Sequence, residues 1–161
     1  LGSYINQVTG RDMLLWNGGC HVHSRFSVEH IIALKQKYPD AEVLSHPECK
    51  GPVLAISDFV GSTAAILKYA VKSPKNTFIV ATESGILHQM RHECPDKTFI
   101  PAPPEISEDT IGCSCNECNY MKLNTLEKVY NCLKYEWPSV DVKPEVAKEA
   151  IKPIKRMLEL S

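Results

Sequence analysis

Two loops of the chain carry cysteine close to a predicted helix. Cys20 stands with His21 and His23 ahead of one helix, and Cys118 stands ahead of another. The positive end of a helix dipole stabilises a nearby thiolate, which is the form of cysteine that binds metal ions. Cys20 and Cys118 are therefore candidate metal ligands, although two packing cysteines would produce the same pattern.

A polar turn offers groups for proton transfer. His46-Pro47-Glu48 follows a predicted strand. Glu48 is a candidate general acid or base, and His46 is a candidate for orienting a substrate or relaying a proton. The structural alternative is a polar turn that Pro47 stiffens.

A second polar segment, Gly61-Ser62-Thr63, opens a predicted helix. Ser or Thr at this place is ordinary helix capping. The free N–H groups and hydroxyls of a helix N-terminus also bind phosphate or carboxylate. Ser62 and Thr63 are therefore candidates for both tasks.

The seven cysteines limit the class of protein. An odd number without a signal peptide argues against a disulfide framework, and clustered thiols then favour metal binding or redox chemistry. Cys132 lies within a predicted helix and Cys94 at the end of another, and packing as small apolar side chains is the simpler interpretation for both. Cys113, Cys115 and Cys118 with a histidine leave open a small zinc or thiol-redox module.

Composition excludes other classes of function. The chain has 161 residues, of which 43% are hydrophobic, so it can build a core. Its 18 Lys and Arg nearly balance 19 Asp and Glu, which argues against binding nucleic acid or an anionic membrane. No apolar run is long enough to cross a bilayer, and we expect a cytoplasmic protein.

Strands and helices are predicted to alternate. Strands are expected at 12–16, 41–45, 77–81 and 98–100. Helices are expected at 28–38, 64–71, 86–93 and 125–137, with a helical turn within 52–59. One or two further helices, broken near Pro153, are expected over 144–160. Such alternation predicts an α/β fold with a parallel sheet. Ligands bind at the carboxyl ends of such strands, where Cys20, His46, Ser62, Glu83 and Cys118 are expected to gather.

The chain also repeats itself with a period near 98 residues. The matching pairs are Cys20 with Cys118, Ser27-Val28-Glu29 with Thr125-Leu126-Glu127, Tyr38-Pro39 with Trp137-Pro138, Glu42-Val43 with Asp141-Val142, and Pro47-Glu48 with Pro144-Glu145. This period exceeds that of solenoid repeats and indicates domain duplication. Duplicated units related by a rotation axis bring their cysteines toward that axis. A third unit upstream of Leu1 would supply a further ligand.

Four motifs in order resemble quinolinate synthases. They are Trp16-Asn17-Gly18-Gly19-Cys20-His21-Val22-His23, His46-Pro47-Glu48-Cys49, Asp58-Phe59-Val60-Gly61-Ser62-Thr63 and Cys118-Asn119-Tyr120-Met121-Lys122-Leu123-Asn124. The resemblance implies three-layer α/β/α domains with short parallel sheets, three of them around a pseudo-threefold axis. It implies the end of the second domain at 1–26, the third domain at 27–112, and a cysteine loop with C-terminal helices at 113–161. The first domain is then absent.

The same resemblance implies a cofactor and a reaction. A [4Fe–4S] cluster with one open iron is held by one cysteine per domain, here Cys20 and Cys118, with a third expected in the missing domain. The enzyme condenses iminoaspartate with dihydroxyacetone phosphate to quinolinate, phosphate and water in NAD biosynthesis. A functional link to the L-aspartate oxidase that makes iminoaspartate is implied. The fragment alone is expected to be inactive.

Roles for single residues also follow from the resemblance. His46 and Glu48 correspond to a His-x-Glu that contacts substrate and transfers protons, with Pro47 between them. Ser62 and Thr63 correspond to a pair that binds substrate. Cys118 is preferred to Cys115 as the ligand because it matches Cys20 in the repeat and because Met121 and Asn124 follow it at the family's spacing.

The neighbouring residues receive lesser roles. Cys49 has no cysteine partner in the repeat, where Val146 takes its place, and is expected to be structural. His23 is expected to hydrogen-bond near the cysteine loop, and Glu83 to help shape the site. A redox role for Cys113 and Cys115 stays open, because their close spacing makes a disulfide between them strained.

Overall fold

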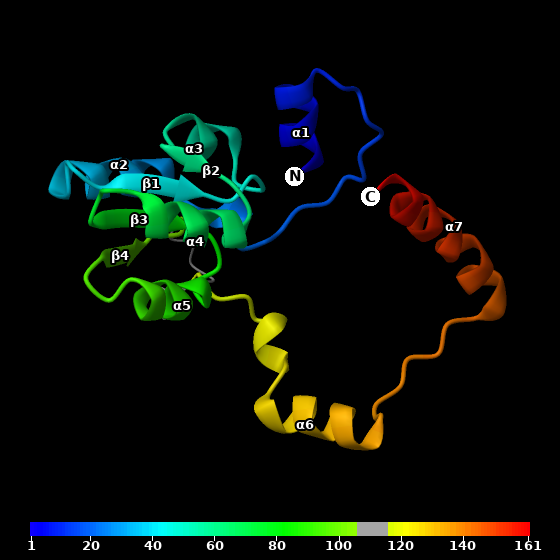
Figure 1. The fold of residues 1–161 in the computed structure, drawn as a ribbon. Helices are drawn as coiled ribbons and strands as arrows, with labels where there is room; N and C mark the ends of the chain where they lie inside the picture. The colour runs from blue at the N-terminus through cyan, green and yellow to red at the C-terminus, as the bar shows by residue number, and fades with distance from the viewer. Residues whose placement is uncertain (106–115) are drawn as a thin grey trace. The chain divides into compact units, whose positions relative to one another are not determined.

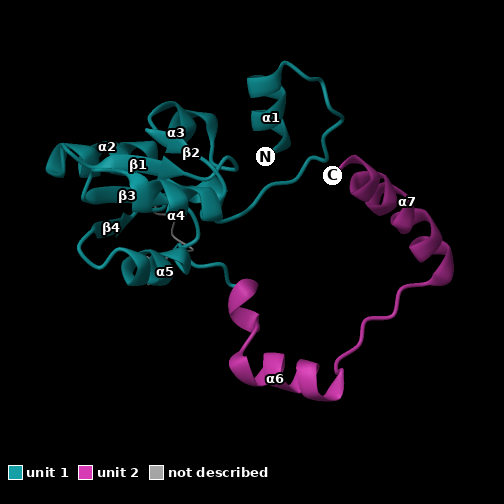
Figure 2. Cartoon of the chain, viewed as in Figure 1, with its two compact units in different colours: residues 1–119 teal, residues 120–161 magenta. Residues whose placement is uncertain are grey.

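A computed structural model describes residues 1–105 and 116–161. They form two compact units, Leu1–Asn119 and Tyr120–Ser161 (Figure 2). Within the described ranges, no helix is both long and apolar enough to cross a membrane.

The first unit is built on a parallel sheet of four strands (Figure 1). The strands are β1 (Glu42–Ser45), β2 (Phe59–Val60), β3 (Thr77–Ala81) and β4 (Thr98–Pro101), in the order β2-β1-β3-β4. β3 is one of the two inner strands, and four of its five residues are buried. A parallel strand covered on both faces is expected to be apolar throughout, and β3 follows this rule.

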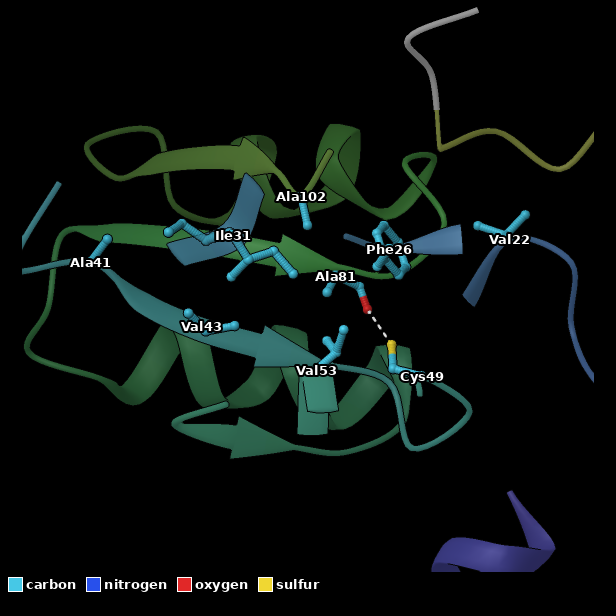
Figure 3. Close-up of a cluster of buried hydrophobic side chains, with 10 residues drawn as sticks. Val22, Phe26, Ile31, Ala41, Val43, Cys49, Val53, Ala81 and Ala102 are labelled. Carbon is cyan, nitrogen blue, oxygen red and sulfur yellow. Dashed lines mark hydrogen bonds between the residues drawn. The ribbon is translucent and has the colours of Figure 1, made fainter. Parts of the chain in front are cut away.

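Helices cover both faces of the sheet (Figure 1). α2 (Val28–Lys37) and α3 (Gly51–Ala55) pack on the face that carries Val43 and Ile79 (Figure 3). α4 (Thr63–Lys72) and α5 (Ile86–Glu93) pack on the opposite face, which carries Leu44 and Phe78. Neighbouring residues of a strand point to opposite faces, so β1 and β3 each supply both cores. The predicted three-layer α/β/α architecture is confirmed.

The strand predicted at 12–16 is wrong. The first unit begins with helix α1 (Gly2–Thr9), and residues 12–16 form neither helix nor strand. The backbone N–H of Met13 donates to Asn6 Oδ1 at 3.0 Å, and the Asn6 amide donates to the Met13 carbonyl at 3.3 Å. The Asn6 side chain therefore occupies the N–H and carbonyl of Met13, which would otherwise pair with a neighbouring strand. Leu14 and Trp16 are exposed, so the segment is not buried as a strand either.

Two other predictions need correction. The helical turn expected within 52–59 ends at Ala55, and Phe59 and Val60 form β2 instead. Residues 136–143, which include the repeat match Asp141-Val142, form neither helix nor strand. The last helix, α7 (Pro144–Leu160), runs without interruption through Pro153.

The sequence repeat has a structural counterpart over its first half. A 3-10 helix, η1 (His23–Arg25), follows Cys20, and another, η3 (Met121–Leu123), follows Cys118 at the same spacing. Ser27 caps α2 by accepting from the N–H of His30, and Thr125 caps α6 (Leu126–Tyr135) in the same way. α2 and α6 each have ten residues. The correspondence ends after these helices, because β1 has no equivalent in the second unit.

Ile79 in β3 tests the core on the α2 side of the sheet. It is completely buried. We expect Ile79→Val to lower the free energy of unfolding by about 0.5–1.5 kcal/mol, because one buried methyl group is lost. Urea unfolding followed by circular dichroism measures the change. Ile32→Val, at a position 42% exposed on α2, is the matched control and should stay within about 0.5 kcal/mol. Equal losses in both variants would contradict this packing.

Candidate active site

The order of the strands creates a crevice at one edge of the sheet. β1 and β3 are neighbours, but the chain leaves β1 toward β2 on one side and leaves β3 toward β4 on the other. Ser45 pairs with Ala81 at the carboxyl ends of β1 and β3, and the N–H of His46 donates to the Ala81 carbonyl at 3.1 Å. Ligands bind at such a switch point in open α/β sheets.

The turn after β1 places Glu48 in this crevice. The N–H of Glu48 donates to His46 Nδ1 at 3.3 Å, and the N–H of Cys49 donates to the His46 carbonyl at 2.9 Å. Pro47 is buried between them. Glu48 Oε2 lies 3.9 Å from His46 Nδ1, and its side chain is 31% exposed. The carboxylate is therefore fixed in position and still open to a ligand.

His23 meets the same carboxylate from another part of the chain. Its Nδ1 lies 3.2 Å from Glu48 Oε2, and its Nε2 lies 3.0 Å from the hydroxyl of Thr82, the residue after β3. Its ring stacks on the ring of His46 with centroids 4.3 Å apart. The sequence predicted only that His23 hydrogen-bonds near the cysteine loop. No local pattern indicates Thr82, which lies 59 residues away.

Both imidazoles are shifted toward the neutral form. Burial lowers the pKa of His23, the proximity of His46 lowers it further, and Glu48 opposes the shift. Burial likewise lowers the pKa of His46 against the opposing effect of Glu48. The ordinary pKa of histidine is about 6.5, so both rings are mostly neutral at pH 7.

The two predicted metal ligands border one apolar cluster. Cys20 and Cys118 are partly buried, and both pack against the core on the α2 side of the sheet. The N–H of Cys118 donates to Glu83 Oε1 at 3.3 Å, while Glu83 Oε2 accepts from the N–H of Gly85 at 2.8 Å. A Cβ atom at position 85 would lie 2.7 Å from that Glu83 oxygen, so glycine leaves room for the carboxylate.

Asn116 anchors the segment that carries Cys118, a role that no sequence pattern indicates. It is 5% exposed, its amide donates to the Ala102 carbonyl just after β4, and its own carbonyl accepts from the N–H of Ser84 at 3.1 Å. Both contacts lie at the carboxyl edge of the sheet. Asn116 thus holds the start of this segment beside the ends of β3 and β4.

Ser62 and Thr63 stand at the next strand end. The N–H of Gly61 donates to the Ser45 carbonyl at 3.1 Å, which keeps the β2 exit beside β1. The Ser62 hydroxyl accepts from the N–H of Ala65 at 3.2 Å and caps α4. A Cβ at position 61 would lie 2.8 Å from the Phe59 ring, so glycine permits this tight entry. Ser62 is exposed and remains accessible to an anion.

The remaining cysteines divide into three groups. Cys49 and Cys94 are buried, as expected for packing residues, whereas Cys132 is exposed and the packing prediction is wrong for it. The Cys49 thiol donates to the Ala81 carbonyl at 3.4 Å (Figure 3), and burial raises its pKa to about 12. Cys113 and Cys115 lie outside the described residues.

Two pockets differ in their relation to these residues. One of about 270 Å³ is lined by α1, by Gly18 and Gly19, and by Pro47, Glu48 and Cys49. The other, of about 540 Å³, lies in the second unit and contains none of the predicted site residues. The smaller pocket borders Glu48, and we therefore consider it the more relevant to chemistry.

The protein is thus of the open parallel α/β class, with acid–base groups at the switch point of the sheet, where ligands bind in such folds. The family described as "Quinolinate synthetase A protein" matches residues 1–159, and the chain belongs to this family.

Curated relatives agree with the family match. The chain is 50% identical over its full length to a quinolinate synthase of Synechococcus sp. (strain ATCC 27144) and covers 49% of that relative. It is 52% identical, again over all 161 residues, to the quinolinate synthase of Chloroherpeton thalassium and covers 49% of it. The chain thus spans about half the length of the curated relatives it matches.

Thiol labelling tests the contrast between Cys49 and Cys132. We expect iodoacetamide at pH 8 to modify Cys132 readily and Cys49 very slowly, because only the thiolate reacts and Cys49 is buried with its pKa near 12. Peptide mass spectrometry measures the extent of labelling at each site. Both cysteines should label alike in urea, and rapid labelling of Cys49 in the folded chain would contradict its buried placement.

Proposed function

We propose that the chain forms the cluster-binding and proton-transferring half of a quinolinate synthase. The reaction condenses iminoaspartate with dihydroxyacetone phosphate to give quinolinate, phosphate and water. The supporting observation is that His46, Glu48 and Cys20 lie together at the switch point. The backbone N–H of Cys118 donates to Glu83 at the same edge of the sheet. Membership of the family supplies the reaction.

The described thiols suit an iron–sulfur cluster. Cys20 and Cys118 are partly exposed, come from equivalent places in the repeat, and border one apolar cluster. Thiolates are the usual cluster ligands, and apolar surroundings limit access of water. In this proposal a third cysteine comes from another domain, and a [4Fe–4S] cluster with an open iron supplies Lewis acidity when bound.

Glu48 is the proposed general acid and base. Its carboxylate is fixed by its turn, lies near two imidazoles and keeps an exposed edge. His46 Nδ1 accepts a hydrogen bond from the Glu48 backbone, so the neutral ring carries its proton on Nε2. That N–H is available to orient a substrate oxygen while Glu48 moves protons.

Ser62 and Thr63 are the proposed anion-binding residues, and Pro47 contributes to the substrate-binding turn. Both substrates carry negative charge, and the N-terminus of α4 offers N–H groups beside the Ser62 hydroxyl. The cap leaves Ser62 exposed at the end of β2, next to β1.

The wider assignments rest on the same family membership. We propose that residues 1–26 complete a second domain, 27–112 form a third, and 113–161 hold the cysteine loop and terminal helices. A cytoplasmic location and a link to an L-aspartate oxidase belong to this proposal. The zinc or thiol-redox module on Cys113, Cys115 and Cys118 is not favoured, because the family match explains the whole chain.

A segment exchange tests the proposal. We expect a Synechococcus quinolinate synthase whose matching part is replaced by these 161 residues to bind iron and sulfide and to form quinolinate. Cys20→Ser and Cys118→Ser should each strip the cluster, while Cys132→Ser should not. Iron analysis and chromatography of quinolinate are the measurements. Full cluster loading after loss of Cys20 or Cys118 would refute their role as ligands.

Glu48→Gln in the same exchanged enzyme separates chemistry from cluster binding. The amide keeps the shape of the side chain but cannot transfer protons, so kcat should fall by about 10²–10⁴-fold with iron content unchanged. Glu29→Gln, on the exposed surface of α2, is the matched control and should retain activity. An unchanged kcat for Glu48→Gln would remove this residue from the mechanism.

A further inference from the structure

Three side chains at the switch point face one another with metal-binding atoms. Cys20 Sγ, a ring nitrogen of His23 and a carboxylate oxygen of Glu48 all lie within 4.8 Å of one another. They come from the loop before η1, from η1 itself and from the turn after β1. The fold, rather than local sequence, therefore brings them together.

The Nδ1 atom of His23 has an unusual environment. His23 is only 7% exposed, and among the described residues this nitrogen has no hydrogen-bond partner. Glu48 Oε2 lies 3.2 Å away but is not aligned for a hydrogen bond. Buried polar atoms are normally satisfied, so an unsatisfied nitrogen beside a carboxylate needs an explanation.

The contact of His23 Nε2 with the Thr82 hydroxyl suggests an explanation for the unsatisfied Nδ1. When Nε2–H donates to the Thr82 hydroxyl, Nδ1 carries no proton, and its lone pair is free to bind a cation beside Glu48 and Cys20. In that tautomer the two electron-rich atoms, 3.2 Å apart, repel each other unless a proton or a metal ion lies between them. Metal-bound histidines characteristically donate their other ring N–H to such a partner, which fixes the tautomer.

We propose that Cys20, His23 and Glu48 form a mononuclear zinc site in the cluster-free chain. Thiolate, imidazole and carboxylate are all zinc ligands, whereas Mg²⁺ and Ca²⁺ prefer oxygen alone. Tetrahedral zinc needs neighbouring ligand atoms about 3.3–3.6 Å apart. The His23 Nδ1 to Glu48 Oε2 distance of 3.2 Å is already close to this, and the Cys20 sulfur lies within 4.8 Å of a ligand atom of each. Three protein ligands leave a fourth position for water.

The neighbouring groups are excluded as ligands by their own contacts. His46 Nδ1 accepts from the Glu48 backbone, and the Cys49 thiol donates to the Ala81 carbonyl. Cys118 is not part of this group of ligand atoms. The zinc site therefore shares Cys20, but not Cys118, with the proposed cluster.

Sharing Cys20 gives the site a consequence beyond the proposed function. Zinc and an iron–sulfur cluster cannot both use this thiolate, so occupation by one prevents assembly of the other. Zinc would also bind Glu48, the proposed proton-transferring group. A chain that has bound zinc therefore cannot assemble the cluster, and its Glu48 carboxylate is not free to act as a base.

Cobalt and zinc titration of the reduced, cluster-free 161-residue chain tests the proposal. One Co²⁺ per chain should bind, with a thiolate charge-transfer band and the intense visible bands of a tetrahedral ion. One equivalent of Zn²⁺ should remove these bands. Circular dichroism checks that every variant is folded. The readout requires no catalysis, so it succeeds or fails separately from the proposed enzyme activity.

Variants identify the ligands. Cys20→Ser should abolish the charge-transfer band, and His23→Phe and Glu48→Gln should each weaken binding at least about tenfold. Thr82→Val, which removes only the partner of Nε2, should weaken it about 10–100-fold. Cys118→Ser and Cys132→Ser are the controls and should bind as the parent does. Absence of binding, a band that survives Cys20→Ser, or a band lost in Cys118→Ser would overturn the proposal.

Discussion

The pairing of β1 with β3 is the constraint on which the site depends. Ser45 lies opposite Ala81, so the two strands end together and the residues that follow them, His46 and Thr82, enter the loops at the same level. A shift of one residue would reverse which side chains face each core. Fully buried apolar residues on both faces of both strands oppose such a shift. The register is therefore enforced by packing, and His23 can contact Thr82 and Glu48 together only because of it.

Much of the layered fold could be predicted from local patterns. The strand at Thr77–Ala81 and the helices at Val28–Lys37 and Ile86–Glu93 were expected within a residue or so, because β-branched runs, capping residues and helical spacing agree there. The candidate residues could be assigned to one edge because loops that follow parallel strands share it. Such reasoning needs no knowledge of distant contacts.

The rest depended on particular side-chain and strand-pairing contacts that no local pattern indicates. Residues 12–16 have the composition of a strand, but Asn6 binds the backbone of Met13 instead. β2 has two residues, too few for a periodic signal, and exists because it pairs with Leu44 and Ser45. The contact of His23 with Glu48 and the anchoring by Asn116 join separate segments through side chains, and no spacing within the sequence encodes them.

Asn116 has a further consequence, for evolution and for genetics. The segment that bears Cys118 is attached to the ends of β3 and β4 through the hydrogen bonds of Asn116 and that of the Cys118 N–H to Glu83, and its described residues add no strand to the sheet. Substitutions at Asn116 can displace the Cys118 thiol from the edge of the sheet while the two apolar cores stay intact. Under the proposed cluster-binding function, loss of the cofactor and loss of the fold are thus separable defects, and a complete loss-of-function allele can still encode an abundant, well-folded protein.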